Sequence, residues 1–283
     1  MDIRPLFGRS SSHQLENIDL DLAGGDVALP VIEGDVSVHI DHADIAMSLA
    51  DENIHLIDPV GQVDHTRIDA SAGDDEARAA VRAASNDAIG ILSGRRATRN
   101  VIDYVRTHGI DTLVLPRQFG RGPLGRRRHD RIAELAPCEV ISVGGDGRFR
   151  AFASILVPVA AGPHTGLAAA VAGHIADECD AWIDILHVLP SDTTEMEREE
   201  AKERLTTIGE RVGPANTVNP WVLAADDPAG AIIEQSAYYG LTVIGAPTSG
   251  RLKRFFHGST SHEIRREADS LVIAAHAHHI GAT

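Results

Sequence analysis

The sequence contains an internal repeat, and this repeat constrains the fold more than any other feature. Residues 27–34 and 155–162 are short apolar segments that carry proline at the same position and end at glycine. Each reads as a buried strand that enters a loop. In both halves a helical segment follows, and then a second apolar run at 54–57 or 182–189. A repeat with a period near half the chain predicts two related domains.

Later segments of the two halves correspond as well. Residues 101–109 precede the apolar run 112–115, and residues 232–240 precede the run 241–244. In both cases we expect the glycine before the run to end a helix in the left-handed conformation. A further helical segment and an apolar strand close each half. This alternation predicts, for each half, a doubly wound, Rossmann-like α/β fold with a five-stranded parallel sheet and helices on both faces.

The pattern divides the chain into four segments. These are an N-terminal extension at 1–25, a first domain at 26–145, a second domain at 152–276 and a C-terminal tail at 277–283. A Gly-rich linker around 144–148 separates the domains. Ligands of such sheets bind beyond the carboxyl ends of the strands, so we expect any binding site at that edge.

Composition narrows the class of function. The chain has 26 Lys and Arg against 41 Asp and Glu, a formal net charge of -15, which repels nucleic acid and anionic membranes. We expect no nucleic-acid binding. Because no signal sequence or bilayer-length apolar run is visible, we also expect no membrane insertion and a cytoplasmic location. Cys138 and Cys179 show neither disulfide nor zinc-ligand spacing.

The loop after the fourth strand of the second half is the strongest candidate for a binding site. Gly245 ends that strand, and Gly258 and Ser259 open the next helix. Glycine lets a ligand approach the backbone, and free amides at a helix start can bind an anion. Basic side chains between them suit a polyphosphate site or a docking face, and they are Arg251, Lys253, Arg254 and His257.

The same residues also have a structural explanation. Ser259 and Thr260 suit a helix N-cap, and Thr260 with Glu263 forms a capping-box pattern that needs no ligand. The loop charges could equally lie in solvent. The His-rich tract 276–279 could bind a divalent metal, but a tail is the commoner reading, and we expect no native metal site.

The loop resembles the motif Gly-x2-Gly-x9-Gly-(Ser/Thr) of nucleotide-binding universal stress proteins. Gly245, Gly258 and Ser259 match it, whereas Thr248 occupies the position of the middle glycine and Gly250 lies two residues later. The resemblance covers residues 154–275 and, less fully, 26–143. The whole chain therefore resembles a tandem universal stress protein, whose two domains pair as an intrachain pseudo-dimer.

The resemblance implies an adenine nucleotide (ATP, ADP, AMP or cyclic AMP) as ligand of the second domain. Ala160 stands where binding members of the family carry an aspartate that meets the base, so that contact is lost. Main-chain groups near Val159, Val188 and Leu223 remain to meet a base. The candidate binding residues are Val159, Ala160, Gly162, His164, Val188, Leu223, Gly245, Thr248, Gly250, Arg251, Lys253, Gly258, Ser259 and Thr260.

The first domain has lost this motif. Pro116 stands near the first glycine position and the Gly-Ser ending is absent, so we interpret its site as degenerate. Neither a nucleophile elbow nor a Walker sequence is present, which favours regulation over catalysis.

We therefore expect a stress-response regulator that senses an adenine nucleotide and acts on a protein partner. The most specific partner that we expect is a membrane transporter. The resemblance implies this, because domains of the family work beside transporters and channels. Two alternatives stay open, a slow nucleotide hydrolase and a ligand-free interaction scaffold, and each is compatible with a homodimer.

Overall fold

The computed structural model divides into two compact units. One comprises Ala23–Gly144, Arg148–Arg150 and His276–Thr283, and we call it the first half; the other, the second half, comprises Met1–Leu22, Gly145–Gly147 and Ala151–Ala275. The residues that the structure describes are 25–31, 36–58, 66–87, 94–116, 122–145, 149, 152–160, 163–214, 217–246, 252 and 271–278. The expected extension, up to residue 24, lies outside the described residues, as does most of the tail.

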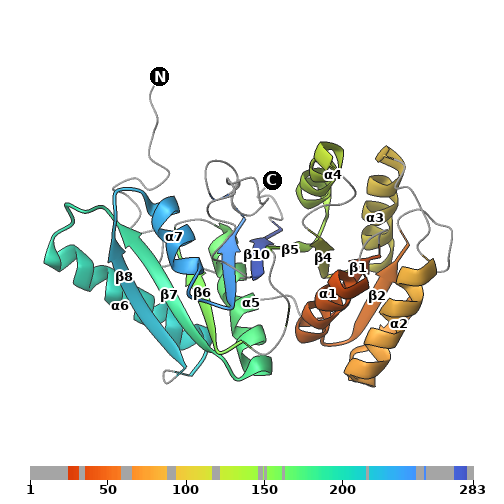
Figure 1. Ribbon diagram of the computed structural model, residues 1–283, viewed down its shortest axis with the longest axis horizontal. Helices are drawn as coiled ribbons and strands as arrows, with labels where there is room; N and C mark the ends of the chain where they lie inside the picture. Colours follow the sequence, from red (N-terminus) through yellow and green to blue (C-terminus); the bar gives the residue numbers. More distant parts are fainter. Residues whose placement is uncertain are drawn as a thin grey trace. The chain divides into compact units, whose positions relative to one another are not determined.

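The first half contains a sheet with the strand order β3-β2-β1-β4-β5. Figure 1 labels β1, β2, β4 and β5 of this sheet. Its strands are β1 (Val27–Pro30), β2 (Asn53–Ile57), β3 (Thr66–Asp69), β4 (Thr112–Pro116) and β5 (Glu139–Gly145). Its helices are α1 (Val36–Leu49), α2 (Asp74–Asp87), α3 (Gly94–His108) and α4 (Gly122–Leu135), with a 3-10 turn η2 at Ala70–Ala72.

The second half repeats this order as β8-β7-β6-β9-β10. Its strands are β6 (Ser154–Pro158), β7 (Trp182–Leu189), β8 (Val218–Ala224), β9 (Leu241–Gly245) and β10 (Leu271–His276). Its described helices of more than one residue are α5 (Pro163–Cys179), α6 (Glu195–Val212) and α7 (Pro228–Ser236). The prediction of two doubly wound α/β halves is confirmed.

One edge strand differs from the prediction. β8 runs parallel to β7, whereas β3 runs antiparallel to β2, with Leu56 opposite Thr66 and Asn53 opposite Asp69. In the second half α6 lies between the two strands along the chain, and such a crossover lets the strands run in the same direction. In the first half β3 precedes α2, so the prediction of a fully parallel sheet is wrong for this strand.

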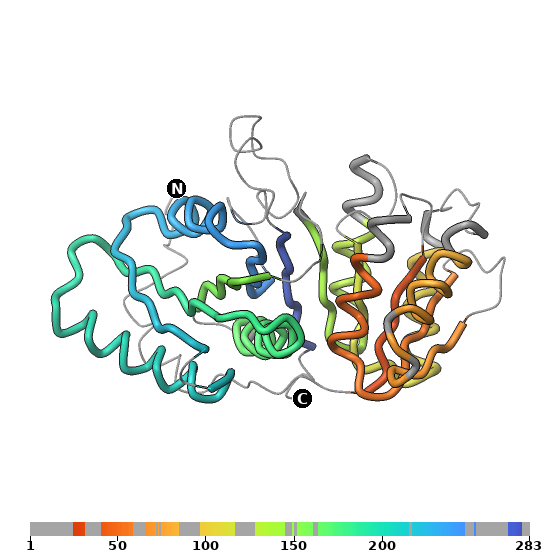
Figure 2. The backbone as a smooth tube through the Cα atoms, turned by 60° about the horizontal axis from the view of Figure 1, so that its bottom comes forward, coloured from red at the N-terminus to blue at the C-terminus, as the bar shows by residue number. Residues whose placement is uncertain are grey.

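Helices cover both faces of the second sheet, as predicted. Ile185 lies under α6, because a Cβ added at Gly209 would lie 3.8 Å from its Cδ1 atom. Leu186 faces the other way and packs with Ile232 of α7. α5 packs on β6 and β9. Figure 2 shows this green helix almost end-on. No helix among the described residues is long and apolar enough to cross a membrane.

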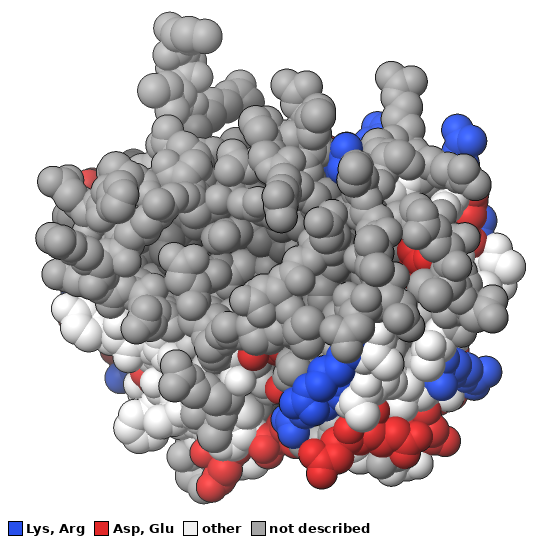
Figure 3. All heavy atoms as spheres, turned by 45° about the vertical axis from the view of Figure 1, so that its right-hand side comes forward, with Lys and Arg blue, Asp and Glu red and all other residues white. Residues whose placement is uncertain are grey.

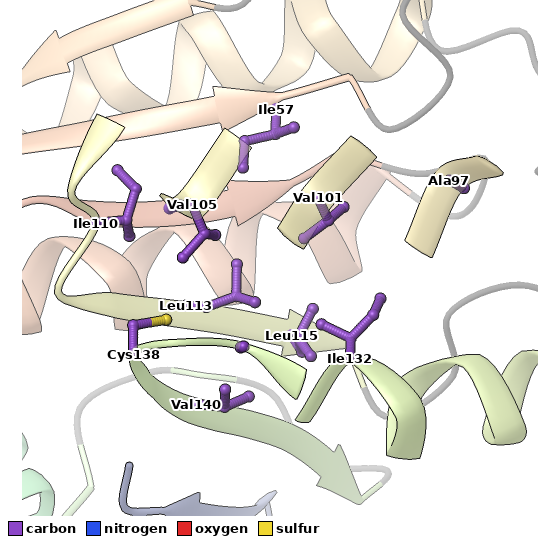
Figure 4. Packing of buried hydrophobic residues seen from close by; sticks show 12 residues of the cluster. Ile57, Ala97, Val101, Val105, Ile110, Leu113, Leu115, Ile132, Cys138 and Val140 are labelled. Atoms are coloured by element: carbon purple, nitrogen blue, oxygen red, sulfur yellow. The ribbon is translucent and has the colours of Figure 1, made fainter. Parts of the chain in front are cut away.

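The core of the first half shows how the apolar periodicity becomes packing (Figure 4). Val101 and Val105, one helical turn apart on α3, pack in one cluster with Leu113 and Leu115 of β4 and Ile132 of α4. All five are at most 1% exposed. Burial of one such side chain contributes roughly 1.5–3 kcal/mol, so this strand and its two helices are held mainly by apolar contact.

Two glycines at helix ends behave differently. Gly109 follows α3 with a φ angle of 64°, which confirms the predicted left-handed ending. Gly240 is not among the described glycines with positive φ, so the same prediction is wrong there. A Cβ at Gly240 would lie 2.7 Å from Cδ1 of Phe152, and the glycine is needed for this close approach instead.

Charged side chains of opposite sign lie side by side on the described surface (Figure 3). Arg78 of α2, for example, donates from Nε to Oδ1 of Asp44 on α1 over 2.8 Å. On α6 acidic and basic side chains are exposed, whereas Ala201, Leu205 and Ile208 are buried.

Candidate functional site

The candidate site lies at the carboxyl edge of the second sheet. The structure describes six of its predicted residues, Val159, Ala160, His164, Val188, Leu223 and Gly245. All six stand at or just beyond the ends of β6, β7, β8 and β9. The remaining predicted residues lie outside the described part of the chain, namely Gly162, Thr248, Gly250, Arg251, Lys253, Gly258, Ser259 and Thr260.

Three hydrogen bonds between described residues hold the turn from β6 to α5. The N–H of Val159 donates to the carbonyl oxygen of Leu186 over 2.7 Å, and the carbonyl oxygen of Val159 lies 2.8 Å from Nδ1 of His187. The hydroxyl of Thr165 donates to the carbonyl oxygen of Ala160 over 2.7 Å. The backbone N–H and carbonyl oxygen of Val159 therefore already have hydrogen-bond partners within the protein, whereas the sequence analysis expected this backbone to meet a nucleobase.

Gly245 brings the end of β9 against the first turn of α5. A Cβ at this position would lie 3.1 Å from the carbonyl carbon of His164 and 3.2 Å from its Cβ. The absence of a side chain at Gly245 thus permits helix packing, whether or not a ligand approaches. The carbonyl group and Cβ of His164 thus lie against the end of β9, so the two predicted residues do come together.

Apolar side chains form a surface next to this turn. Val188 pairs with Leu223 in the parallel register of β7 and β8. Trp221 and Leu252 pack against the same cluster as Val188, and each is partly buried. Leu252 is the residue of the glycine loop, beyond Ala246, that the structure describes, and it packs on this apolar cluster. A planar, weakly polar group such as a nucleobase fits this chemistry.

His187 is a residue at this edge that sequence reasoning missed. Its side chain is 5% exposed. Burial and the positive charge of Arg204 lower the pKa of His187, and together they outweigh the hydrogen bond to Val159, which raises it. The histidine within the apolar run 185–189 of β7 was the sequence signal that could have found it.

The corresponding edge of the first half carries proline where the second half carries glycine. Pro116 ends β4, as Gly245 ends β9, so the position that approaches α5 in the second half carries a proline ring. The turn after β1 keeps part of the backbone pattern, because the N–H of Val31 donates to Ile57 over 2.9 Å.

A polar network at the opposite, amino edge of the first sheet was also missed. His55 of β2 places Nε2 3.0 Å from Oδ2 of Asp26 and Nδ1 2.9 Å from the hydroxyl of Tyr104. The side chain of Asn53 donates to Oδ1 of Asp26 over 2.6 Å. Burial alone would raise the pKa of Asp26, but the hydrogen bonds from Asn53 and His55 and the charges of His55 and Arg67 outweigh it and lower the pKa.

The second half has a counterpart of this network. Asp184 stands on β7 where His55 stands on β2, and it accepts hydrogen bonds from Asn219 over 2.7 Å and from Tyr239 over 2.6 Å. The internal repeat was the signal that could have paired these positions.

One further group of polar residues is too buried to form a site. Nε2 of His129 lies 2.8 Å from the hydroxyl of Ser142, and Nδ1 lies 3.3 Å from Oδ1 of Asp130. Because His129 and Ser142 are at most 1% exposed, no substrate reaches them. Within the described residues no group of three or more His, Cys, Asp or Glu could hold a metal ion.

Comparison with known proteins rests on structure. No family model matches the chain, and no curated protein matches it. The fold is similar to a universal stress protein from Archaeoglobus fulgidus DSM 4304, with a TM-score of 0.53, 14% identity and coverage of 93% of this chain and 99% of that one. A putative universal stress protein from Pseudomonas aeruginosa UCBPP-PA14 is similar with a TM-score of 0.51 and 18% identity. The match covers 89% of this chain and 93% of that one.

A third similar structure is the cytoplasmic domain of a prokaryotic cation chloride cotransporter. It gives a TM-score of 0.56 at 12% identity and covers 90% of this chain and 96% of that domain. These likenesses define the class of fold, two α/β halves in a single chain. In particular, the fold is that of a tandem universal stress protein.

Proposed function

We propose that the chain is a cytoplasmic regulatory protein of the universal stress protein type, and that its second half binds an adenine nucleotide. The observation that carries the proposal is the close approach of Gly245 to His164, which puts the start of α5 beside the strand that leads into the glycine loop. The spacing from Gly245 to Gly258 and Ser259 predicts from the sequence a second helix start, which lies outside the described residues. Two helix starts and four basic loop residues suit a phosphate chain.

A membrane transporter is the partner that we propose for the regulated step. The support is the likeness of the fold to the cytoplasmic domain of a cation chloride cotransporter. A domain of this fold in another protein is joined to a transporter, so a separate chain of the same fold could act on one by binding it.

Thermal unfolding with ATP, ADP, AMP and cyclic AMP tests nucleotide binding. A ligand that binds only the folded state stabilises it by about 2.7 kcal/mol at roughly a hundredfold excess over Kd. We expect Gly258→Asp to abolish the shift, because a carboxylate at a helix start repels phosphate. Gly213→Asp is the matched control, since Gly213 has an extended backbone and a Cβ there makes ordinary contacts.

Trp221 offers a second readout. It packs on the cluster that contains Val188, whereas Trp182 is 61% exposed at the amino end of β7. The chain has 2 Trp residues, so Trp182→Phe leaves Trp221 as the sole tryptophan reporter. A nucleotide beside Leu223 changes the emission of Trp221, and unchanged emission at saturating ATP argues against the proposed placement.

A ligand-free interaction scaffold is the second candidate function. It is favoured by Ala160, which offers no carboxylate to a base, and by the engaged backbone of Val159. If none of the four nucleotides shifts thermal unfolding at millimolar concentration, the scaffold replaces the nucleotide sensor.

A further inference from the structure

The amino edge of the second sheet exposes an aromatic side chain beside a fixed carboxylate. Trp182 opens β7 and is 61% exposed. Asp184 stands two residues further along the same strand. Because successive side chains of a strand alternate between faces, both lie on the same face of the sheet, about 7 Å apart along the strand. A single long side chain of a ligand can therefore reach both.

The carboxylate of Asp184 is held by two neutral donors. Oδ1 accepts from the side-chain nitrogen of Asn219 over 2.7 Å, and Oδ2 accepts from the hydroxyl group of Tyr239 over 2.6 Å. Neither donor carries a charge, and within the described part of the chain no Lys or Arg forms an ion pair with Asp184. A carboxylate oxygen accepts more than one hydrogen bond, so each oxygen keeps capacity for a further donor.

The packing around Asp184 shows from which side a ligand can approach. Asn219 is the register partner of Asp184 on β8, and Tyr239 reaches it from the turn before β9. Leu186, the next residue of β7 on the same face, is fully buried in the cluster that contains Ile232 of α7. Asp184 itself is partly buried, whereas Trp182 and Asn219 are exposed. A ligand therefore reaches the carboxylate from the amino edge of the sheet.

The charges that precede Trp182 along the chain are negative as well. Asp177 and Glu178 at the end of α5, and Asp180 in the turn that follows, are all exposed. Their charges attract a cation to this edge, although salt screens them. The face of an indole ring also attracts a cation, more strongly than the ring of Tyr or Phe does. The arrangement therefore suits a cationic ligand group.

A guanidinium group fits this arrangement better than an ammonium group. It is planar, donates two parallel N–H groups to one carboxylate and stacks on an aromatic face. An ammonium group is a compact charge that is more strongly hydrated, so it gains less from the ring. Trp, Tyr and Arg are also the residue types that carry most of the binding energy at protein interfaces. An arginine on the surface of another protein is the matching ligand.

We propose that Trp182 and Asp184 form a docking site for an arginine side chain of a protein partner. The guanidinium group bonds to the carboxylate of Asp184 and stacks on the indole ring of Trp182. Asn219 and Tyr239 hold the carboxylate in position. The site lies at the opposite edge of the second sheet from the proposed nucleotide site, so the inference goes beyond the proposed function and does not depend on nucleotide binding.

A pair of peptides that differ in one side chain tests the site. The probe is the blocked peptide acetyl-Gly-Arg-Gly-amide, and its matched control is acetyl-Gly-Lys-Gly-amide. Each is titrated into the isotope-labelled full chain at about 0.15 M salt, where long-range attraction is screened. The indole N–H resonance of Trp182 reports binding by NMR, and Trp182→Phe identifies this resonance. We expect the Arg peptide to bind at least about fivefold more tightly than the Lys peptide.

Two variants separate the docking site from the general negative charge of this edge. Asp184→Asn keeps the shape of the side chain but removes its charge, and it should weaken binding of the Arg peptide at least about tenfold. Asp180→Asn removes an equal charge from the neighbouring turn. Asp180 has a φ angle of 52°, which asparagine also tolerates. This variant should stay within about twofold of the wild-type affinity, because an exposed charge is screened.

Several outcomes overturn the inference. Equal binding of the two peptides does so, as does an equal loss of affinity in Asp184→Asn and Asp180→Asn. If Asp184→Asn fails to fold, the wild-type protein decides, because the Arg peptide must shift the Trp182 indole resonance and the backbone amide resonances of Asp184 and Asn219. Shifts that leave these three unchanged overturn the site. Free arginine that binds as tightly as the Arg peptide overturns the assignment to a protein partner.

Discussion

The hydroxyl group of Tyr239 donates a hydrogen bond to Asp184, with 2.6 Å between the phenol oxygen and Oδ2. Tyr239 lies in the turn before β9, and Asp184 lies on β7, with β6 between the two strands in the sheet. The bond therefore ties together two strands that are not neighbours. Burial raises the pKa of Tyr239, and the hydrogen bond to Asp184 raises it further, so the phenol stays protonated.

Removal of this hydroxyl tests its contribution to stability. We expect Tyr239→Phe to lower the free energy of unfolding by about 1–2 kcal/mol, because a hydrogen bond to a carboxylate is lost while the ring is kept. The adjacent Tyr238 is 74% exposed, so Tyr238→Phe is the matched control and should change stability little. Urea unfolding of both variants measures the difference, and equal midpoints would contradict the assignment.

Acid sensitivity of the first half should depend on Asp26. The pKa of Asp26 is lower in the folded state than the ordinary 3.8, so its ionised form stabilises the fold. This contribution is present above the unfolded-state pKa and is lost as the pH falls through the folded-state pKa. The wild-type protein should lose stability below about pH 5 more steeply than Asp26→Asn. Asp51→Asn, at an exposed turn residue, should keep the wild-type slope.

Gly245→Ala should disturb the packing of α5 on β9. The added methyl group would lie 3.1 Å from the backbone of His164, and backbone cannot rotate away as a side chain can. We expect a loss of about 1–2 kcal/mol in the free energy of unfolding, in the range of overpacked sites. Gly213→Ala is the control, since its methyl group would be 3.4 Å from a Val218 side chain. If both variants unfold at the same urea concentration, the close approach is not tight.

The two cysteines should differ in reactivity. Burial, together with Glu139 and Asp111, raises the pKa of Cys138 to about 12, and burial also raises the pKa of the less buried Cys179. Because the thiolate is the reactive form, iodoacetamide should modify Cys179 first and Cys138 only after unfolding in urea. Mass spectrometry of the Cys179→Ser variant checks this, and rapid labelling of that variant in native buffer would refute it.

The fold could be predicted from the sequence because its signals are local and occur twice. Apolar runs such as 112–115 and 241–244 mark buried strands by themselves, and the repeat orders them. The N-cap of α7 is a local signal of the same kind, since Asp227 accepts from the N–H of Gly230 over 3.0 Å and Pro228 stands in the first turn.

The parts that could not be predicted depend on contacts between distant residues. Gly240 needs no side chain because Phe152 lies against it, and nothing near Gly240 in the sequence shows this. His187 meets Val159, and Asp26 meets His55, only once the strands are paired. For the glycine loop, the prediction stays a prediction, since most of its residues lie outside the described part of the chain.

The direction of β3 bears on the order in which the chain folds. β2 and β3 pair as consecutive antiparallel strands, so the edge of the first sheet closes through contacts that are near in sequence. β8 can pair with β7 only after the chain has passed through α6, which makes that edge a more distant contact. Contacts near in sequence form faster because less chain entropy is lost before they form. The edge of the first half should therefore gain hydrogen-exchange protection earlier in refolding than the edge of the second.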